Sequence, residues 1–312
     1  MSAAELLERV EDGGLLSGPE PLLVLLSGGR DSVCVLDLAV RARGPEAAGA
    51  LHVNYGLREE ADEDERHCGA LCDRLGVALA VERPRRPEGA GNLQAWAREA
   101  RYAAAVRLAE ASAATIVTGH TADDQVETIL YRLASSPSRR ALLGMRPRDG
   151  RLARPLLGTT RAEVTAYCEE RGLAWRDDAS NEEADYKRNL LRRELIPALE
   201  RIHPAAKENV LRTAALLREE AELLDSLVDA ELAGGEGAAP GTIRLARFAE
   251  LHPALRRLVL QRLADQAAGR PVAGAARFAD QVASLSRGGS ALDLGSGVRA
   301  VLESGALRAE RS

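Results

Sequence analysis

The amino-acid sequence predicts an α/β protein with a doubly wound parallel sheet, followed by a smaller, mainly helical domain. Over residues 1–180, short apolar runs alternate with amphipathic segments, which is the pattern of successive βαβ units. After about residue 186, helix follows helix, and short strand-like runs return only near the C-terminus. We therefore expect an α/β domain over residues 1–185 and a mainly helical domain with a short terminal hairpin over residues 186–312.

Four apolar runs predict the parallel strands: Leu22–Leu26, Gly49–Val53, Val77–Val81 and Thr115–Thr118. Helical periodicity predicts the connecting segments Asp31–Ala42, Glu59–Leu75, Asn92–Ala111, Thr121–Leu133 and Thr160–Arg171. Ligands of such sheets bind beyond the carboxyl ends of the strands. The polar residues that follow each strand are therefore the candidate site.

The remainder of the chain is less regular. Residues 135–154 are rich in arginine and serine and have little apolar periodicity, which predicts a mobile surface loop. Further helices are predicted over Arg188–Arg201, Pro204–Ala233 and Arg247–Ala268, with a linker at Gly234–Thr242. Two short runs, Ala291–Leu294 and Val298–Val301, flank Gly-Ser-Gly and predict a hairpin.

Composition places the chain among ordinary globular proteins, with 46% hydrophobic and 29% charged residues. The longest apolar run, Leu22–Leu26, is far shorter than the roughly 20 residues that span a membrane. The acidic, amphipathic start of the chain is not a signal peptide. Four cysteines make no disulfide framework. We therefore expect a cytoplasmic protein without a membrane partner.

Charge is segregated along the chain. The net charge of −5 alone argues against a nucleic-acid partner. However, residues 132–161 carry eight arginines against a single acid, Asp149, whereas residues 58–66 carry six acids. The planar guanidinium group suits contacts with phosphate. The arginine-rich segment is therefore the expected nucleic-acid surface.

The segment Ser27-Gly28-Gly29-Arg30-Asp31-Ser32 directly follows the first strand and opens a helix. Glycines let backbone amides close on an anion, and the helix N-terminus adds positive potential. The segment matches neither Gly-x-x-x-x-Gly-Lys-Ser/Thr nor Gly-x-Gly-x-x-Gly. A plain strand-to-helix turn capped by Asp31 is the alternative. We favour a phosphate-binding loop because of its strand–loop–helix context.

Three acids follow Gly119 and His120 after the fourth strand: Asp123, Asp124 and Glu127. Asp123 and Glu127 are four residues apart and share a helix face. Such a pair can hold a cationic amine or a magnesium ion, and a nearby carboxylate or His120 could accept the proton of an amine. The alternative is a set of acids that complements the helix dipole.

Other polar residues are weaker candidates. Arg98 and Arg101 lie one helical turn apart and could reach a phosphate or an amino-acid carboxylate, or form a solvated face. His52 and Asn54 straddle a strand end, and a core role for the histidine is equally compatible. Arg188 and Asn189 form either a polar pair at a helix start or a substrate contact.

Ser-Gly-Gly-x-Asp-Ser after the first strand resembles the PP-loop ATP pyrophosphatase superfamily, whose fold is adenine nucleotide alpha hydrolase-like. Its members hold the pyrophosphate end of ATP and cleave between the α and β phosphates. With residues 52–58, 92–102, 119–128 and 178–189, the chain is similar to the tRNA(Ile)-lysidine synthase family over about residues 20–205. Members of this family are ATP-dependent ligases that modify tRNA.

The resemblance implies that residues 1–185 form the catalytic PP-loop domain. ATP would adenylate the C2 oxygen of the wobble cytidine in tRNA(Ile) with a CAU anticodon. The side-chain amine of free L-lysine would then give lysidine, with AMP and pyrophosphate as products and Mg²⁺ as cofactor. A homodimer is left open.

The residues and the resemblance together assign ATP binding to Ser27, Gly28, Gly29, Arg30, Asp31, Ser32, His52, Asn54, Gly119 and His120. Catalysis or lysine binding is assigned to Asp123, Asp124, Glu127, Arg98 and Arg101, and metal binding to Asp31 and Asp123. Contact with tRNA is assigned to Arg139, Arg140, Arg188 and Asn189.

The chain departs from this family at two places. Tyr55 stands where the family commonly has a second histidine, and residues 134–138 read Ala-Ser-Ser-Pro-Ser where an Arg-Gly-rich stretch is expected. Longer members also carry a further C-terminal domain. Two other interpretations stay open: a related tRNA thiolase, which needs catalytic or cluster-binding cysteines, and a non-catalytic tRNA-binding protein.

Overall fold

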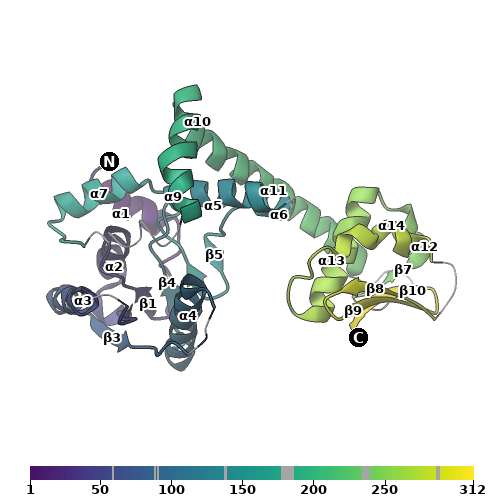
Figure 1. Cartoon of the computed structure of the whole chain (residues 1–312), viewed down its shortest axis with the longest axis horizontal. Coiled ribbons are helices and arrows are strands. Elements are labelled where there is room, and N and C mark those ends of the chain that lie inside the picture. The colour runs from purple at the N-terminus through teal and green to yellow at the C-terminus, as the bar shows by residue number, and fades with distance from the viewer. Residues whose placement is uncertain are drawn as a thin grey trace. The chain divides into compact units, whose positions relative to one another are not determined.

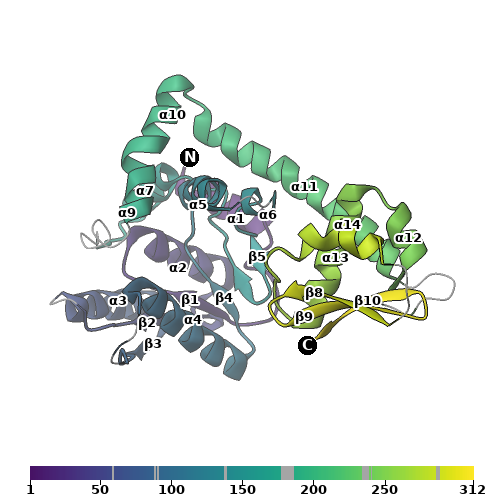
Figure 2. The ribbon, with the colours of Figure 1, turned by 45° about the vertical axis from the view of Figure 1, so that its right-hand side comes forward.

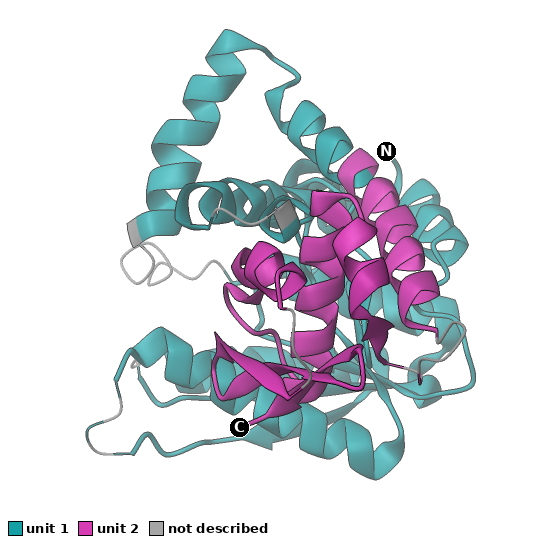
Figure 3. Cartoon of the chain, turned by 90° about the vertical axis from the view of Figure 1, so that its right-hand side faces the viewer, with its two compact units in different colours: residues 1–215 teal, residues 216–312 magenta. Residues whose placement is uncertain are grey.

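The computed structural model describes residues 1–57, 60–87, 89, 91–136, 139–176, 186–233, 239, 241–285 and 289–312. The chain forms two compact units, Met1–Ala215 and Leu216–Ser312, which Figure 3 colours separately. Each unit has a sheet of its own. The boundary expected between residues 185 and 186 lies beside residues 177–185, which are outside the described part of the chain.

The first unit is built on a six-stranded sheet with the order β3-β2-β1-β4-β6-β5 (Figure 1). Its strands are β1 Leu22–Leu25, β2 Ala48–Val53, β3 Ala78–Glu82, β4 Thr115–Val117, β5 Arg148–Asp149 and β6 Leu152–Ala153. All neighbours pair in parallel except β5, which runs antiparallel to β6. The strand order reverses beside β1, so the carboxyl ends of β1 and β4 border the crevice where such sheets bind ligands.

Helices cover both faces of this sheet, as predicted for a doubly wound fold. The helices near it are α1 Ala3–Asp12, α2 Arg30–Arg43, the 3-10 turn Pro45–Ala47, α3 Ala61–Leu75, α4 Leu93–Ser112 and α7 Arg161–Glu170. Leu22 and Val24 of β1 pack in one core with α2, α3 and α7, whereas Leu23 and Leu25 pack with Ala105 of α4. Alternate residues of a strand point to opposite faces, so α2 and α4 lie on either side of the strands (Figure 2).

A second group of helices continues from the sheet: α5 Ala122–Ser135, α6 Arg139–Leu142, α9 Tyr186–Leu190, α10 Ile196–Ile202 and α11 Ala206–Leu232. Between α9 and α10, Leu191–Leu195 forms a π-helical turn in which the Ile196 amide donates to the Leu191 carbonyl. Pro197 follows at once and has no amide to donate, which favours this wider turn. The helix predicted over 188–201 therefore exists but is not uniform.

The expectation of a mobile surface loop at 135–154 is wrong for its described residues. This segment contains α6, β5 and β6, and β6 extends the parallel sheet. Gln125 of α5 holds it by two hydrogen bonds to Met145, one from Nε2 to the carbonyl over 2.9 Å and one from the amide to Oε1 over 2.7 Å. Arg132 donates to the Gly144 carbonyl over 2.9 Å. The groups that order the segment lie on α5, so the local sequence did not reveal them.

The second unit packs helices on a four-stranded antiparallel sheet of order β7-β10-β9-β8. Its elements are β7 Ile243–Arg244, α12 Leu245–Glu250, α13 Pro253–Ala268, the 3-10 turn Ala275–Phe278, α14 Ala279–Ala283, β8 Ser290–Gly295, β9 Val298–Glu303 and β10 Ala306–Arg311. The predicted hairpin is confirmed as β8–β9. The single helix predicted over 247–268 is wrong, because Pro253 cannot continue a helix from its preceding turn and starts α13 instead.

Most of the linker predicted at 234–242 lies outside the described residues. Within the described part of the chain, no helix combines the length and apolar character that crossing a membrane requires.

Candidate active site

The glycine loop, residues 27–32, joins β1 to α2 and is held by its own serines. Ser32 Oγ accepts from the Ser27 amide over 3.2 Å and donates to the Gly29 carbonyl over 2.8 Å. Gly28 has a φ of +86°, which only glycine adopts without strain. The amides of Ser32 and Val33 also donate to the Gly29 carbonyl. The earlier amides of the first turn have no intrahelical acceptor, which is the arrangement that binds anions.

Asp31 lies in the first turn of α2, where it pairs with Arg30 at 3.3 Å. Burial, followed by the neighbouring charge of Asp124, raises the pKa of the Asp31 carboxyl despite Arg30 and Arg161. The glycine loop and the start of α5 therefore bring two carboxylates within electrostatic reach of each other. A cation between them would relieve this repulsion.

His120 follows β4 and is largely buried, with Nδ1 2.8 Å from Thr118 Oγ1. Burial lowers its pKa to about 4, and the charges of Arg154, Arg101 and Arg98 act in the same direction, against that of Asp124. At neutral pH the imidazole is therefore uncharged. It can exchange a proton or a hydrogen bond with a ligand, but it adds no positive charge to the site.

The acid cluster consists of Asp123, Asp124 and Glu127 on α5. Asp123 Oδ2 accepts from the backbone amide of Arg161 over 2.7 Å, and Oδ1 lies 3.4 Å from Lys207 Nζ. Burial, the largest influence, raises the pKa of Asp123, but the Arg161 amide, Lys207 and the Arg161 charge together lower it below its usual range. Asp123 is therefore a carboxylate with both oxygens engaged by this chain.

The other two acids share two arginines. Asp124 Oδ1 lies 3.4 Å from Arg161 Nη2 and 3.5 Å from Arg192 Nη2. Glu127, which is almost fully buried, accepts from Arg192 Nε. Burial raises the pKa of Glu127, and the guanidinium of Arg192 opposes this rise. The cluster thus has the charge that suits a cationic amine, and arginines of the chain itself compensate it.

The sequence analysis missed Arg161, Arg192 and Lys207 as individual members of the site. Arg161 starts α7, Arg192 lies in the π-helical turn, and Lys207 belongs to the first turn of α11. The only available signal was the regional excess of basic residues. Which of them reach the acid cluster is decided by how α5, α7 and the helices after residue 186 pack.

His52 and Asn54 lie at the end of β2, and both are buried. His52 Nδ1 is 2.9 Å from the Leu26 carbonyl, directly before the glycine loop. Asn54 Nδ2 donates to Asp62 and Glu65 of α3, over 3.0 and 2.9 Å. These contacts fix the glycine loop and the start of α3 relative to β2.

Tyr55, at the position where a histidine was expected, connects the end of β2 to α4. Its hydroxyl donates to the Ala97 carbonyl over 2.9 Å, and its ring meets Trp96 edge-on at 5.7 Å between centroids. The residue therefore has a packing role that a smaller histidine would not reproduce.

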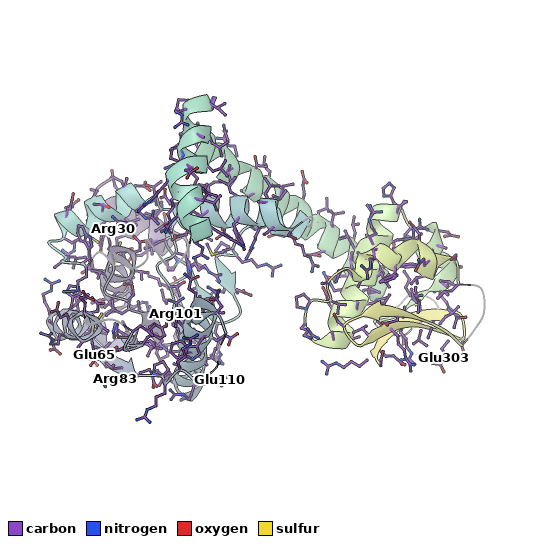
Figure 4. All side chains as sticks on the ribbon, in the orientation of Figure 1. Arg30, Glu65, Arg83, Arg101, Glu110 and Glu303 are labelled. Carbon is purple, nitrogen blue, oxygen red and sulfur yellow. The ribbon has the colours of Figure 1, made fainter. Side chains whose placement is uncertain are left out.

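Arg98 and Arg101 project from α4 on the side of the sheet opposite α2; Figure 4 labels Arg101 there and Arg30 at the start of α2. Both guanidinium groups lie near the Tyr102 ring, with Cζ 4.9 and 5.5 Å from its centroid. Both also act on His120, so they face the carboxyl end of β4. The site is thus acidic on the α5 side of His120 and basic on the α4 side.

The predicted tRNA contacts belong to α6 and α9 of the first unit. Arg140 is exposed on α6, and Arg188 is exposed on α9 beside the half-buried Asn189. Arg139 begins α6, but its side chain lies outside the described part. Arg58 and the stretch Asp178–Asn181, which contributed to the family resemblance, also lie outside it.

Several curated proteins are similar to this chain in sequence. The chain is 40% identical over 263 residues to tRNA(Ile)-lysidine synthase of Thermus thermophilus, covering 83% of this chain and 51% of that protein. It is 41% identical over 223 residues to the synthase of Pseudomonas syringae and 42% identical over 227 residues to that of Chromobacterium violaceum. These matches cover 69% and 70% of this chain, and 49% and 51% of those proteins. The chain therefore spans about half the length of the curated relatives it matches.

A solved structure shares the fold: the U34-tRNA thiolase NcsA from Methanococcus maripaludis superimposes with a TM-score of 0.59 at 18% identity, over 69% of this chain and 78% of that one. A sequence profile of the PP-loop domain matches residues 2–199, which contain the glycine loop, His120 and the acid cluster. The chain therefore belongs to the PP-loop family of ATP-binding domains.

Proposed function

We propose that this chain is an ATP-dependent tRNA(Ile)-lysidine synthase. The observation that carries the proposal is the meeting of the glycine loop and the acid cluster at the carboxyl ends of β1 and β4, in a chain about 40% identical to lysidine synthases. The substrates are ATP, free L-lysine and tRNA(Ile) with a CAU anticodon, and the protein acts in the cytoplasm. Residues 1–185 form the catalytic PP-loop domain, and the helices after residue 186 add Arg192 and Lys207 to its site.

The glycine loop is the proposed site for the β and γ phosphates of ATP. The amides at the start of α2 and the hydroxyls of Ser27 and Ser32 can donate to phosphate oxygens. Gly119 and His120 border the same crevice from β4, where the α phosphate would be exposed to a nucleophile. His52 and Asn54 support the loop from β2.

Asp31 is the residue that fits a magnesium ion. It lies in the first turn of α2, and burial, followed by the charge of Asp124, raises the pKa of its carboxyl. Mg²⁺ typically uses one or two carboxylates together with substrate phosphates. Bound there, it would neutralise charge that develops on the phosphates. Asp123 was the second predicted ligand, but both its oxygens accept from the Arg161 amide and Lys207.

The acid cluster is the proposed site for the lysine side-chain amine. Its carboxylates can hold an ammonium group and receive the proton that must leave before the amine attacks. Arg161, Arg192 and Lys207 now compensate these carboxylates, so an incoming ammonium would replace one of them. Arg98 and Arg101 offer positive charge for the carboxylate of lysine or for a phosphate.

The proposed reaction has two balanced steps. First, the C2 oxygen of the wobble cytidine attacks the α phosphorus, the bond to the β phosphate breaks, and pyrophosphate leaves. Second, the lysine amine attacks C2, loses a proton, and displaces AMP together with the former C2 oxygen. In this scheme the glycine loop holds the leaving group, and the acid cluster holds the nucleophile.

The proposed RNA contacts are Arg139, Arg140, Arg188 and Asn189. Arg140 and Arg188 are exposed on separate short helices, α6 and α9, which suits contact with successive phosphates. We also keep a homodimer as a hypothesis for the assembled enzyme.

Sulfur transfer, the activity of the related thiolase, is not favoured. All four cysteines are buried thiols in the cores around α2, α3 and α7. Burial raises the pKa of Cys68 to about 12 and that of Cys72 to about 11, so neither forms a reactive thiolate readily. A folded cysteine-free variant should therefore keep full activity.

The decisive experiment measures incorporation of labelled lysine. Purified protein with ATP and Mg²⁺ should attach lysine to tRNA(Ile) with the CAU anticodon, but not to a tRNA with a different wobble base, and should release AMP and pyrophosphate. If folded protein attaches no lysine, or releases ADP and orthophosphate instead, the proposal fails. If ATP does not raise the melting temperature, the non-catalytic interpretation gains.

A further inference from the structure

A second positively charged feature lies on the basic side of His120, away from the glycine loop. The arginine cluster consists of Arg98 and Arg101 of α4, Arg132 of α5 and Arg154 after β6. Arg98, Arg101 and Arg154 all act electrostatically on His120, and Arg98 and Arg132 act on Arg154. Three different elements therefore bring four guanidinium groups to one region of the crevice.

Arg154 is the unusual member because it is only 7% exposed. Its Nη1 donates to the Arg146 carbonyl over 2.6 Å, and its backbone amide donates to the Pro147 carbonyl over 2.8 Å. Its Nε is buried and has no hydrogen-bond partner within the described part of the chain. The same is true of Arg101 Nε. Buried donors are normally satisfied, so two unmet guanidinium donors in one cluster indicate a missing acceptor.

The charge balance indicates what that acceptor is. Among the groups that act most strongly on Arg154, the carboxylate is Asp149, which is exposed on β5. Tyr102, which lies beside Arg98 and Arg101, is a phenol and not a carboxylate. Arg154 is thus opposed by one exposed carboxylate, whereas the charges of Arg98 and Arg132 add to its own. A single amino-acid carboxylate would leave most of this charge uncompensated, whereas a phosphate group carries more charge and more acceptor oxygens.

We infer that Arg154 and Arg101 form the centre of a phosphate-binding subsite, separate from the glycine loop, that Arg98 and Arg132 complete. The subsite rests on the proposed function, because it takes a phosphate that the same reaction brings to the crevice. Two sources supply that chemistry: a phosphodiester of the RNA substrate, or the pyrophosphate formed from ATP. The planar guanidinium group of arginine can donate to the phosphate oxygens of either source.

The test compares Arg154→Met with wild type, using two probes. One is an RNA stem–loop carrying the CAU anticodon, and the other is inorganic pyrophosphate with Mg²⁺. Arg154→Met keeps the aliphatic stem and removes the charge. We expect the affinity for the correct probe to fall about 10-fold or more, as for loss of a charge-assisted hydrogen bond. For RNA, the slope of log affinity against log salt should also decrease by about 1.

The outcome also identifies the source. Loss of RNA affinity with unchanged pyrophosphate binding assigns the subsite to the RNA backbone, and the converse assigns it to pyrophosphate. Unchanged affinity for both probes in folded Arg154→Met overturns the inference. An effect confined to the KM for lysine also overturns it, since the subsite would then hold a carboxylate. Failure of wild type to bind either probe has the same consequence.

Two further variants control the test. Arg107→Met removes the same charge from an exposed side chain that pairs with Glu82, outside the arginine-rich segment, and should change both affinities less than 2-fold. Arg101→Met provides a second route if Arg154→Met does not fold, because Arg101 has the other unmet Nε. Both probes bind without turnover. A wild-type protein that incorporates no lysine would therefore count against the proposed function. Probe affinities that are the same in Arg154→Met and wild type would count against the subsite alone.

Discussion

Gly119 and Asp31 meet backbone to backbone: a Cβ atom on Gly119 would lie 2.4 Å from the Asp31 carbonyl oxygen and 2.6 Å from its carbonyl carbon. The end of β4 therefore supports the first turn of α2 directly. Because this turn carries the amides proposed to bind phosphate, any side chain at residue 119 moves the phosphate site relative to His120.

We predict that Gly119→Ala weakens ATP binding more than it affects folding. The methyl group cannot fit against a backbone carbonyl, so α2 must shift, at a cost of about 1–3 kcal/mol in the free energy of unfolding. The rise in melting temperature caused by ATP should fall by more than half. Gly158→Ala is the matched control, because a Cβ there meets nothing within 4 Å. Equal ATP-induced shifts in the two variants would show that the contact does not position the loop.

The depressed pKa of His120 predicts a loss of stability in mild acid. The ordinary pKa of 6.5 applies to the unfolded chain, whereas burial lowers the value to about 4 in the folded protein. Between these values the unfolded state binds more protons, so stability falls as the pH drops through this window and is constant above it. The linkage amounts to about 2 kcal/mol between pH 7 and pH 5.

Urea unfolding at pH 7 and pH 5 checks this prediction. In His120→Asn the amide can still bond to Thr118. The difference in the free energy of unfolding between pH 7 and pH 5 should then be smaller than in wild type by about that amount. The exposed His203→Asn should leave the difference as it is in wild type. A His120→Asn protein with the full wild-type pH dependence would assign the acid sensitivity to other groups.

The sheet and its first helices could be predicted because local sequence determines them. Leu22–Leu25 is a buried run between polar segments, and Asn92 and Thr121 accept hydrogen bonds from the first-turn amides of α4 and α5. Such signals lie within a few residues of the element they define. The glycine loop and the acid cluster could be selected as candidates for the same reason, since each directly follows a strand.

The partners of those groups could not be predicted because they come from distant parts of the chain. Arg154, Arg161 and Arg192 stand among many other arginines, and nothing in the local sequence separates them from Arg146 or Arg151. The packing of α5 against the π-helical turn selects Arg192. Likewise Gln125, which is on a different element, orders the segment that was expected to be mobile.

The contact between Arg192 and Glu127 predicts a non-additive pair of mutations. Arg192→Met removes a positive charge that compensates the nearly fully buried carboxylate of Glu127. It should therefore lower the free energy of unfolding by more than the loss of one exposed ion pair would. Adding Glu127→Gln removes the charge that needs compensation and should recover part of the stability. Urea unfolding of the four proteins should give a coupling energy of about 1–3 kcal/mol. Simple additivity would mean that the pair is separated in solution.

The arginine-rich segment predicts a salt-dependent contribution to RNA binding. Replacing both Arg139 and Arg140 with alanine should weaken binding of tRNA(Ile) and lower the slope of log affinity against log salt by up to about 2. Arg83→Ala with Arg107→Ala removes the same number of charges from side chains that pair with Glu65 and Glu82, and should have a smaller effect. An unchanged slope in the first double variant would remove α6 from the RNA interface.

Asp31→Asn separates catalysis from stability most clearly. The asparagine keeps the size of the side chain and removes a charge that burial and Asp124 already disfavour, so the free energy of unfolding should stay constant or rise slightly. Pyrophosphate release should nevertheless fall by more than about 100-fold, because the proposed metal ligand is lost. Titration with Mg²⁺ provides the second measurement: the dependence of ATP binding on Mg²⁺ should weaken in Asp31→Asn but remain in Asp123→Asn. If Asp123→Asn alone loses that dependence, the metal ion is held on α5, and the assignment of Asp31 as its ligand is wrong.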